Sequence, residues 1–164
     1  MNDLIKKIID EREITALLIE YCRALDYMDL NAISKLFSED CDVKFGPDDQ
    51  LNSYGPKAVA KSLERMWRWE RTSHHLSNVS IQFSGSYKAS SVSYVLAWHE
   101  RADKTTATIY GQYHDELRRE NDRWVITKRT MFMNGSDSGF TVNIFPFKRN
   151  TAPKNWISPN IDKN

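Results

Sequence analysis

The hydrophobic pattern of the chain changes its period near Thr72, and this change constrains the fold more than any other feature. Up to about residue 70 the apolar residues recur at helical spacing, whereas from Thr72 onward they alternate as in β-strands. Asp29 suits a helix N-cap, and Pro56 suits the first helical position. The first part therefore predicts, in order, helix 3–28, helix 31–37, strand 41–45 and helix 57–70.

The second part of the chain predicts four long strands joined by short turns, at 74–84, 88–102, 106–119 and 123–134. Strands of this length with short connections form an antiparallel meander, which we expect to curl strongly. Three helices followed by such a sheet make an α+β architecture. The sheet would wrap around the first helix and leave a cone-shaped cavity. We predict one domain over 1–140 and a C-terminal extension over 141–164, in which the apolar run Phe140–Phe147 forms an edge strand or folds over the cavity.

Composition excludes several classes of function. The 164 residues are 40% hydrophobic and 27% charged with a net charge of +1, so no basic excess indicates nucleic acid. No apolar run approaches the length of a membrane span or a secretory leader, which favours a cytoplasmic protein without a membrane partner. Cys22 and Cys41 form no C-x-x-C motif and are predicted to be buried small residues. Adjacent His74 and His75 would point to opposite sides of a strand, so neither a metal nor a nucleotide cofactor is predicted.

Asp26 is the polar residue whose position in the sequence is least compatible with exposure to water. It continues the row Ile14–Leu18–Cys22 along the apolar stripe of the first helix. A half-buried carboxylate needs a partner or a raised pKa, and histidine is the partner best suited to proton transfer near neutral pH. The alternative is that Asp26 forms a salt bridge with Arg23 or Arg129.

Two adjacent histidines are candidates for that partner. Strict alternation backward from the apolar residues of 79–83 places His75 on their face of the strand. Leu76 has the parity of His74, so a bulge between Leu76 and Val79 would place His74 on that face instead. From the pattern alone both assignments stay open.

Beyond these features, polar and aromatic residues follow one another in a characteristic order. The order is Tyr21…Leu25-Asp26…Asp29…Leu36-Phe37…Asp40, then Thr72-x-His74…Asn78, Gly111-x-Tyr113-x-Asp115 and Trp124-x-Ile126…Arg129. Over roughly residues 8–134 it resembles the SnoaL-like branch of the nuclear transport factor 2-like superfamily. Similar enzymes of that family are hexachlorocyclohexane dehydrochlorinase, scytalone dehydratase and bile-acid 7α-dehydratase. The resemblance implies an α+β cone, a homodimer or homotrimer, and cofactor-independent chemistry on a small hydrophobic cyclic molecule.

The resemblance also implies roles for individual residues. His74 would act as general base on an acidic C–H bond, and Asp26 would orient it. Arg129 matches an arginine that stabilises the leaving group, and Tyr21 matches a tyrosine that assists the loss of hydroxide. For Arg129, an ion pair with Asp26 or Asp115 is the structural alternative.

Substrate-binding positions follow in the same way. Val43, Leu96 and Tyr113 match pocket residues of the dehydrochlorinase, although that enzyme has an aromatic residue where Val43 stands. Trp98, two residues beyond Leu96, is predicted to join them. His99 ends the same apolar run and is predicted to be a strand-end residue.

Two classes of function are compatible with these residues. The first is a lyase or isomerase that uses a His–Asp dyad for proton abstraction and elimination, on a polyketide-like or steroid-like substrate. The alternative is a non-catalytic small-molecule-binding or assembly domain of the same fold, because a fold does not determine a function. The small subunit of a ring-hydroxylating dioxygenase is a weaker third possibility.

Overall fold

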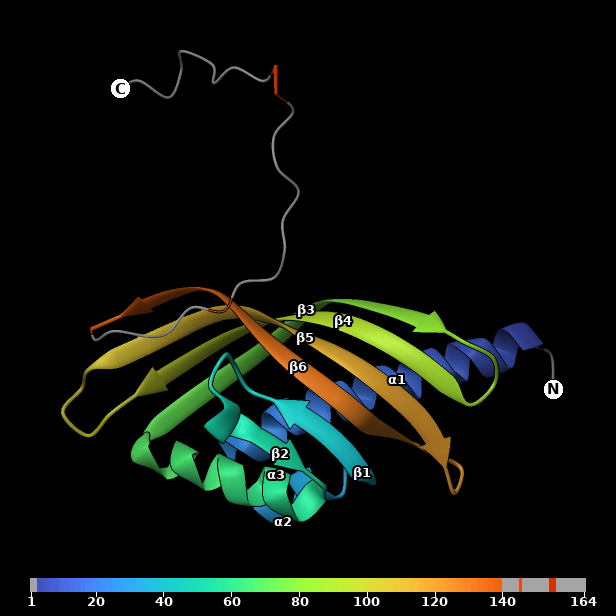
Figure 1. The fold of residues 1–164 in the computed structure, drawn as a ribbon, viewed down its shortest axis with the longest axis horizontal. Coiled ribbons are helices and arrows are strands. Elements are labelled where there is room, and N and C mark those ends of the chain that lie inside the picture. Colours follow the sequence, from blue (N-terminus) through green and yellow to red (C-terminus); the bar gives the residue numbers. More distant parts are fainter. Residues whose placement is uncertain (1–2, 140–144, 146–153, 156–164) are drawn as a thin grey trace.

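A computed structural model of the chain describes residues 3–139, 145 and 154–155. Figure 1 shows α1 running along the sheet beside β3, while α2 and α3 gather around β1 and β2. The elements are α1 (Asp3–Asp26), α2 (Leu30–Ser34), β1 (Phe37–Lys44), the 3-10 helix η1 (Asp49–Leu51), β2 (Asn52–Tyr54), α3 (Pro56–Leu63), the 3-10 helix η2 (Glu64–Arg68), β3 (Arg71–Phe83), β4 (Lys88–Glu100), β5 (Thr106–Glu120) and β6 (Arg123–Ser138).

The six strands form one mixed sheet in the order β2-β1-β6-β5-β4-β3. The predicted meander β3 to β6 is antiparallel throughout, but β1 pairs with β6 in parallel. The prediction of an entirely antiparallel sheet is therefore wrong. A parallel pair needs a long crossover, and the chain between β1 and β6 provides one. The sheet is also twisted rather than strongly curled (Figure 1), so the predicted degree of curvature is wrong as well.

The ends of the first elements differ from the prediction in an informative way. The Asp29 side chain accepts the backbone N–H of Ala32 at 2.8 Å, which confirms the predicted N-cap of α2. However, α2 ends at Ser34, and Phe37 already begins β1. Pro56 begins α3 as predicted, and the helix tightens into η2 after Leu63. Tertiary pairing with β6 thus converts the end of the predicted second helix into strand.

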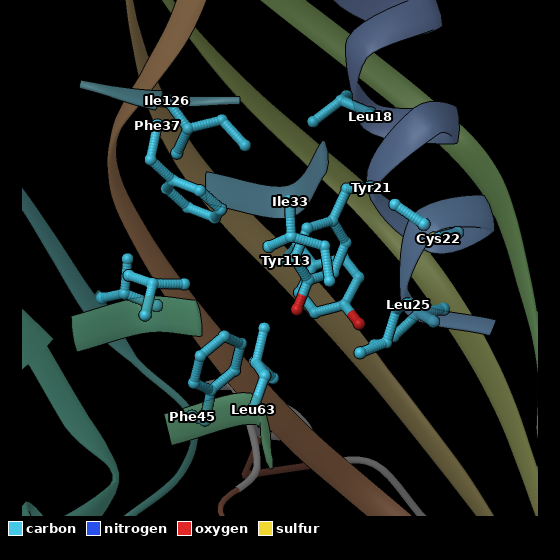
Figure 2. Close-up of a cluster of buried hydrophobic side chains, with 14 of the residues drawn as sticks. Leu18, Tyr21, Cys22, Leu25, Ile33, Phe37, Phe45, Leu63, Tyr113 and Ile126 are labelled. Atoms are coloured by element: carbon cyan, nitrogen blue, oxygen red, sulfur yellow. The ribbon is translucent and has the colours of Figure 1, made fainter. Parts of the chain in front are cut away.

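The core lies between α1 and the sheet. The apolar stripe of α1 is buried there, and Cys22 and Cys41 are buried free thiols as predicted. Figure 2 shows Leu18, Tyr21 and Leu25 of α1 pointing toward side chains of the sheet. Burying these side chains contributes on the order of 2 kcal/mol each, which holds the helix against the strands.

Bulges decide which side chains of the long strands face this core, and two of them affect the residues of interest. In β3 the register with β4 shifts between Ser77 and Ser80, where Asn78 has φ of 50°. In β6 the register with β5 shifts opposite Glu116 and Leu117, which leaves Thr127 as the extra residue. Each bulge moves the residues beyond it to the other face of the sheet, because side chains alternate along a strand.

The predicted C-terminal extension lies almost entirely outside the described residues. Phe145 is described, and it exchanges two backbone hydrogen bonds with Met133, of 2.6 and 3.0 Å. Within the described part of the chain, no helix combines the length and apolar character needed to cross a membrane.

Candidate active site

Asp26 and His74 are in direct contact at the end of α1. The Nδ1–H of His74 donates to Oδ1 of Asp26 at 2.7 Å, and the backbone N–H of His74 donates to Oδ2 at 3.0 Å. Thr72 adds a third hydrogen bond, from its hydroxyl to Oδ1, at 2.8 Å. His74 faces the helix because the register shift of β3 between Ser77 and Ser80 changes the phase of the alternation between Leu76 and Val79, as one of the two sequence interpretations requires.

These hydrogen bonds determine the charge of the carboxylate and the tautomer of the imidazole. Burial alone would raise the pKa of Asp26, but the hydrogen bonds from His74 and Thr72 lower it below its ordinary value. An ionised carboxylate only accepts hydrogen bonds, so Nδ1 of His74 carries a hydrogen, and in the neutral imidazole the lone pair is on Nε2. The His74 side chain is 4% exposed and that of Asp26 is 27% exposed, so bulk water reaches the carboxylate more easily than the base.

A cavity of about 440 Å³ opens beside this pair, a size within the usual range for small-molecule sites. His74 forms part of its wall. The other walls come from the end of α1, from α3 and η2, from the loop after β1, and from β4, β5 and β6. Apolar contributions include Leu25, Leu63, Met66 and Ile109. The cavity can therefore hold an apolar molecule against the imidazole.

His99 is a cavity residue that the sequence analysis placed only at a strand end. Its ring lies 5.2 Å from that of His74 and 4.9 Å from that of Trp69. Its Nδ1–H donates to the carbonyl of Ala107 at 3.3 Å, and burial together with His74 lowers the pKa of His99 to about 4. The imidazole is thus neutral near pH 7. In the sequence, only the position of His99 at the end of a predicted hairpin, opposite Ala107, could have indicated a role in the cavity.

Tyr21 and Tyr113 form the inner end of the cavity. Their rings pack edge to face at 5.7 Å, and Figure 2 shows both phenol oxygens directed toward Leu25 and Leu63. Burial raises the pKa of Tyr21 to about 12 and raises the pKa of Tyr113 as well. Both hydroxyls keep their hydrogen at neutral pH and can donate it.

Arg129 does not line the cavity. Its Nε and one terminal nitrogen donate to Asp115 at 2.7 and 2.8 Å, and both side chains are fully buried. The guanidinium lies 4.1 Å from the Tyr21 ring and 4.2 Å from the Tyr113 ring. Burial would lower the pKa of Arg129, but Asp115 raises it above the ordinary value. The ion pair with Asp115, the alternative named from the sequence, is the contact observed.

Only one of the four predicted substrate-binding residues lines the cavity. Tyr113 lines the cavity. Val43 is buried in β1 opposite Arg129, away from the cavity wall. Leu96 and Trp98 lie on the outer face of β4, where Leu96 is 41% exposed, and their neighbours on the inner face form the wall instead. The difference follows from alternation: one step along a strand reverses the face.

In the part of the chain that the structure describes, no group of three or more histidine, cysteine or carboxylate side chains is arranged to hold a metal ion. The polar groups that reach the cavity are instead imidazoles, phenols, three guanidinium groups and the carboxylate of Asp48. This set can move a proton and bind a negative charge.

Comparison with known proteins adds a family and several structures of similar fold. A model of the SnoaL-like domain matches residues 6–130. No curated protein matches. A candidate scytalone dehydratase from Novosphingobium aromaticivorans is 27% identical, covers 92% of this chain and 100% of its own, and superposes with a TM-score of 0.83.

Two further structures share the fold at lower identity. Hexachlorocyclohexane dehydrochlorinase LinA-type3 from Novosphingobium barchaimii is 16% identical, with coverage of 87% of this chain and 98% of its own and a TM-score of 0.74. An NTF2-like protein with a cystatin-like fold from Novosphingobium aromaticivorans is 18% identical, with coverage of 80% and 86% and a TM-score of 0.70. The fold is therefore NTF2-like.

Proposed function

Since this chain belongs to the SnoaL-like domain family, we propose that it is a cofactor-independent lyase or isomerase in which His74 removes a proton from carbon. The substrate is a small hydrophobic cyclic molecule of the polyketide or steroid type. One observation carries the proposal: Nδ1 of His74 is held by Asp26, which leaves Nε2 as the basic nitrogen of a side chain that lines the cavity. Named dehydratase and dehydrochlorinase structures of the same fold support it.

The chemical step needs no external oxidant or reductant. Nε2 of His74 takes the proton from a carbon that is acidified by a neighbouring carbonyl group. The electron pair of the broken C–H bond forms a C=C bond, and the leaving group departs with the electrons of its own bond. The imidazolium then returns the proton to the departing hydroxide, which leaves as water. Asp26 stabilises the imidazolium, and positioned bases of this kind accelerate reactions by on the order of 10²–10⁴-fold.

Tyr21 is the donor best placed to assist the leaving group. Its pKa of about 12 keeps the phenol protonated, and it lines the same cavity as His74. Arg129 contributes by packing against the rings of both Tyr21 and Tyr113, so we assign it a positioning role rather than contact with substrate.

Proton abstraction is common to elimination, isomerisation and cyclisation, so it can be tested before the substrate is identified. The assay is exchange of α-hydrogens of a panel of cyclic ketones into D2O, followed by NMR. His74→Gln should lose the exchange activity, while His75→Gln serves as the matched control because His75 is exposed and hydrogen-bonds Ser73 instead. Asp26→Asn should reduce the rate on the order of 10²-fold.

The same experiment separates catalysis from simple binding. If His74→Gln exchanges hydrogens as fast as the unaltered protein, the dyad is not catalytic. A binding protein would retain its affinity for the ketones in every variant and would show no exchange above the rate in buffer.

We also propose that two or three copies of this chain assemble. The sheet face opposite α1 leaves apolar side chains in solvent, with Leu96 and Tyr110 exposed to 41% and 45%. Burial of such a face between copies would remove this area from water. Light scattering after size exclusion measures the state directly, and Leu96→Glu should shift it toward monomer.

A further inference from the structure

The cavity has an excess of positive charge that proton abstraction by His74 does not require. Arg65, Arg68 and Arg101 line it, and Asp48 is the only carboxylate that lines it among the described residues. The Asp48 carboxylate already accepts the backbone N–H of Gln50 at 2.9 Å as the cap of η1. Among the described residues, three guanidinium groups thus line the cavity together with one carboxylate.

Arg65 is less exposed than Arg68. Its guanidinium stacks on the Phe45 ring at 5.0 Å and donates to the backbone carbonyl and hydroxyl of Ser62. No carboxylate among the described residues lies within ion-pair distance of it. Burial lowers the pKa of Arg65, and the positive charge of Arg68 lowers it further. A desolvated cation without a counter-ion is costly, which an anion entering the cavity would relieve.

Arg68 and Arg101 extend this charge along the wall toward His74. Their guanidinium carbons lie 5.1 and 5.3 Å from the centre of the Trp69 ring. Trp69 contacts His99, which in turn contacts His74. An aromatic bridge therefore separates the base from the cations. A ligand that reaches both must carry its charge one ring or more away from the carbon that loses the proton.

We propose that the ligand of this cavity is a cyclic organic anion, with its apolar skeleton against His74 and a carboxylate or phosphate group bound by Arg65, Arg68 and Arg101. Guanidinium groups bind both oxyanions with two parallel hydrogen bonds, and a low local dielectric strengthens the contact. This inference uses the cavity of the proposed function and deepens it by naming the charge class of the substrate.

The test compares three probes of one skeleton: 2-naphthoate, 2-naphthyl phosphate and the uncharged 2-naphthamide. Titration calorimetry with the unaltered protein should show one or both anions binding about 10- to 100-fold more tightly than the amide. The anion that binds more tightly identifies the group. Added salt should weaken the binding of the anions and leave the binding of the amide unchanged.

Substitutions in the cavity test which arginines produce the preference for anions over the amide. Arg68→Gln and Arg65→Gln should each reduce anion affinity about tenfold without changing amide affinity. Arg123→Gln is the matched control, because it removes the same charge from an exposed residue at the start of β6, outside the cavity. Arg65→Lys retains the charge but not the planar fork, so an intermediate loss is expected.

Binding is measured here without catalysis, so the two proposals fail separately. His74→Gln should keep the preference for anions even if hydrogen exchange is lost. Equal affinity for anion and amide, a preference that survives both glutamine variants, or no anion binding at millimolar concentration would each overturn the inference. None of these results would bear on proton abstraction from neutral ketones.

Discussion

His99 should make the protein less stable in mildly acidic solution, and its replacement should remove that loss. Burial, assisted by the neighbouring His74, lowers the pKa of His99 from 6.5 to about 4. In the unfolded chain the imidazole is hydrated and its pKa returns to about 6.5. Between these values the unfolded state binds a proton that the folded state does not. The free energy of unfolding therefore falls as the pH falls through this window.

The size of the effect follows from the same two values. The interval from 6.5 to about 4, at about 1.4 kcal/mol per pH unit, gives a loss of about 3 kcal/mol. The residue is only 6% exposed, so screening by solvent reduces this little. Above pH 6.5 both states hold a neutral ring, and below about pH 4 both are protonated. The loss is confined to the interval between them.

Urea unfolding followed by tryptophan fluorescence, at a series of pH values from 7 to 4, measures this quantity. His99→Gln keeps a donor for the Ala107 carbonyl but cannot titrate, so its stability should depend on pH by about 3 kcal/mol less. His75→Gln, at an exposed position, should follow the unaltered protein. Parallel pH profiles for His99→Gln and the unaltered protein would refute the reasoning. The neutrality of His99 matters for function because a second positive ring would oppose charge on His74.

Three further changes test other parts of the structure. Arg129→Met should cost about 3–5 kcal/mol in urea unfolding by leaving Asp115 buried without a partner, and the double change Arg129→Met with Asp115→Leu should recover part of that loss. Gly111→Ala should destabilise by about 1–3 kcal/mol, because the added Cβ would overlap a backbone carbonyl of β6, whereas Gly135→Ala meets only an ordinary contact and should change the melting temperature little. Asp26→Asn should lose less stability than the unaltered protein when the pH is lowered below about 4. Because the pKa of Asp26 is lower in the folded protein than its unfolded value of 3.8, the ionised carboxylate stabilises the fold above pH 3.8. That contribution is lost as the pH falls through the folded pKa.

Patterns that depend on neighbours along the chain were predicted well. The apolar stripe of α1, the capping role of Asp29 and the four strands after Thr72 all depend on local periodicity and backbone preference. The contact of Asp26 with a histidine follows from the same stripe, since a carboxylate on a buried face needs a partner. The order of residues along the chain also indicated the SnoaL-like family.

Patterns that depend on strict alternation were predicted less well. Counting by two from Phe83 leads to His75, and counting by two from Ile126 would likewise place Arg129 on the opposite face of its strand. Each strand contains a bulge between the two points, and the bulge reverses the parity. Leu96 was assigned to the cavity by resemblance and Trp98 was predicted to join it, but the cavity side of β4 belongs to Ala97 and His99.

The sequence by itself determined the helices, the strands and the need of Asp26 for a partner, because these follow from interactions among residues close together in the chain. Only the tertiary structure decided which histidine meets Asp26, which carboxylate pairs with Arg129, and that Arg65, Arg68 and His99 share one cavity. Those outcomes depend on the register between strands and on bulges. A single inserted residue changes the face of every side chain beyond it, while the local pattern of the sequence remains almost the same.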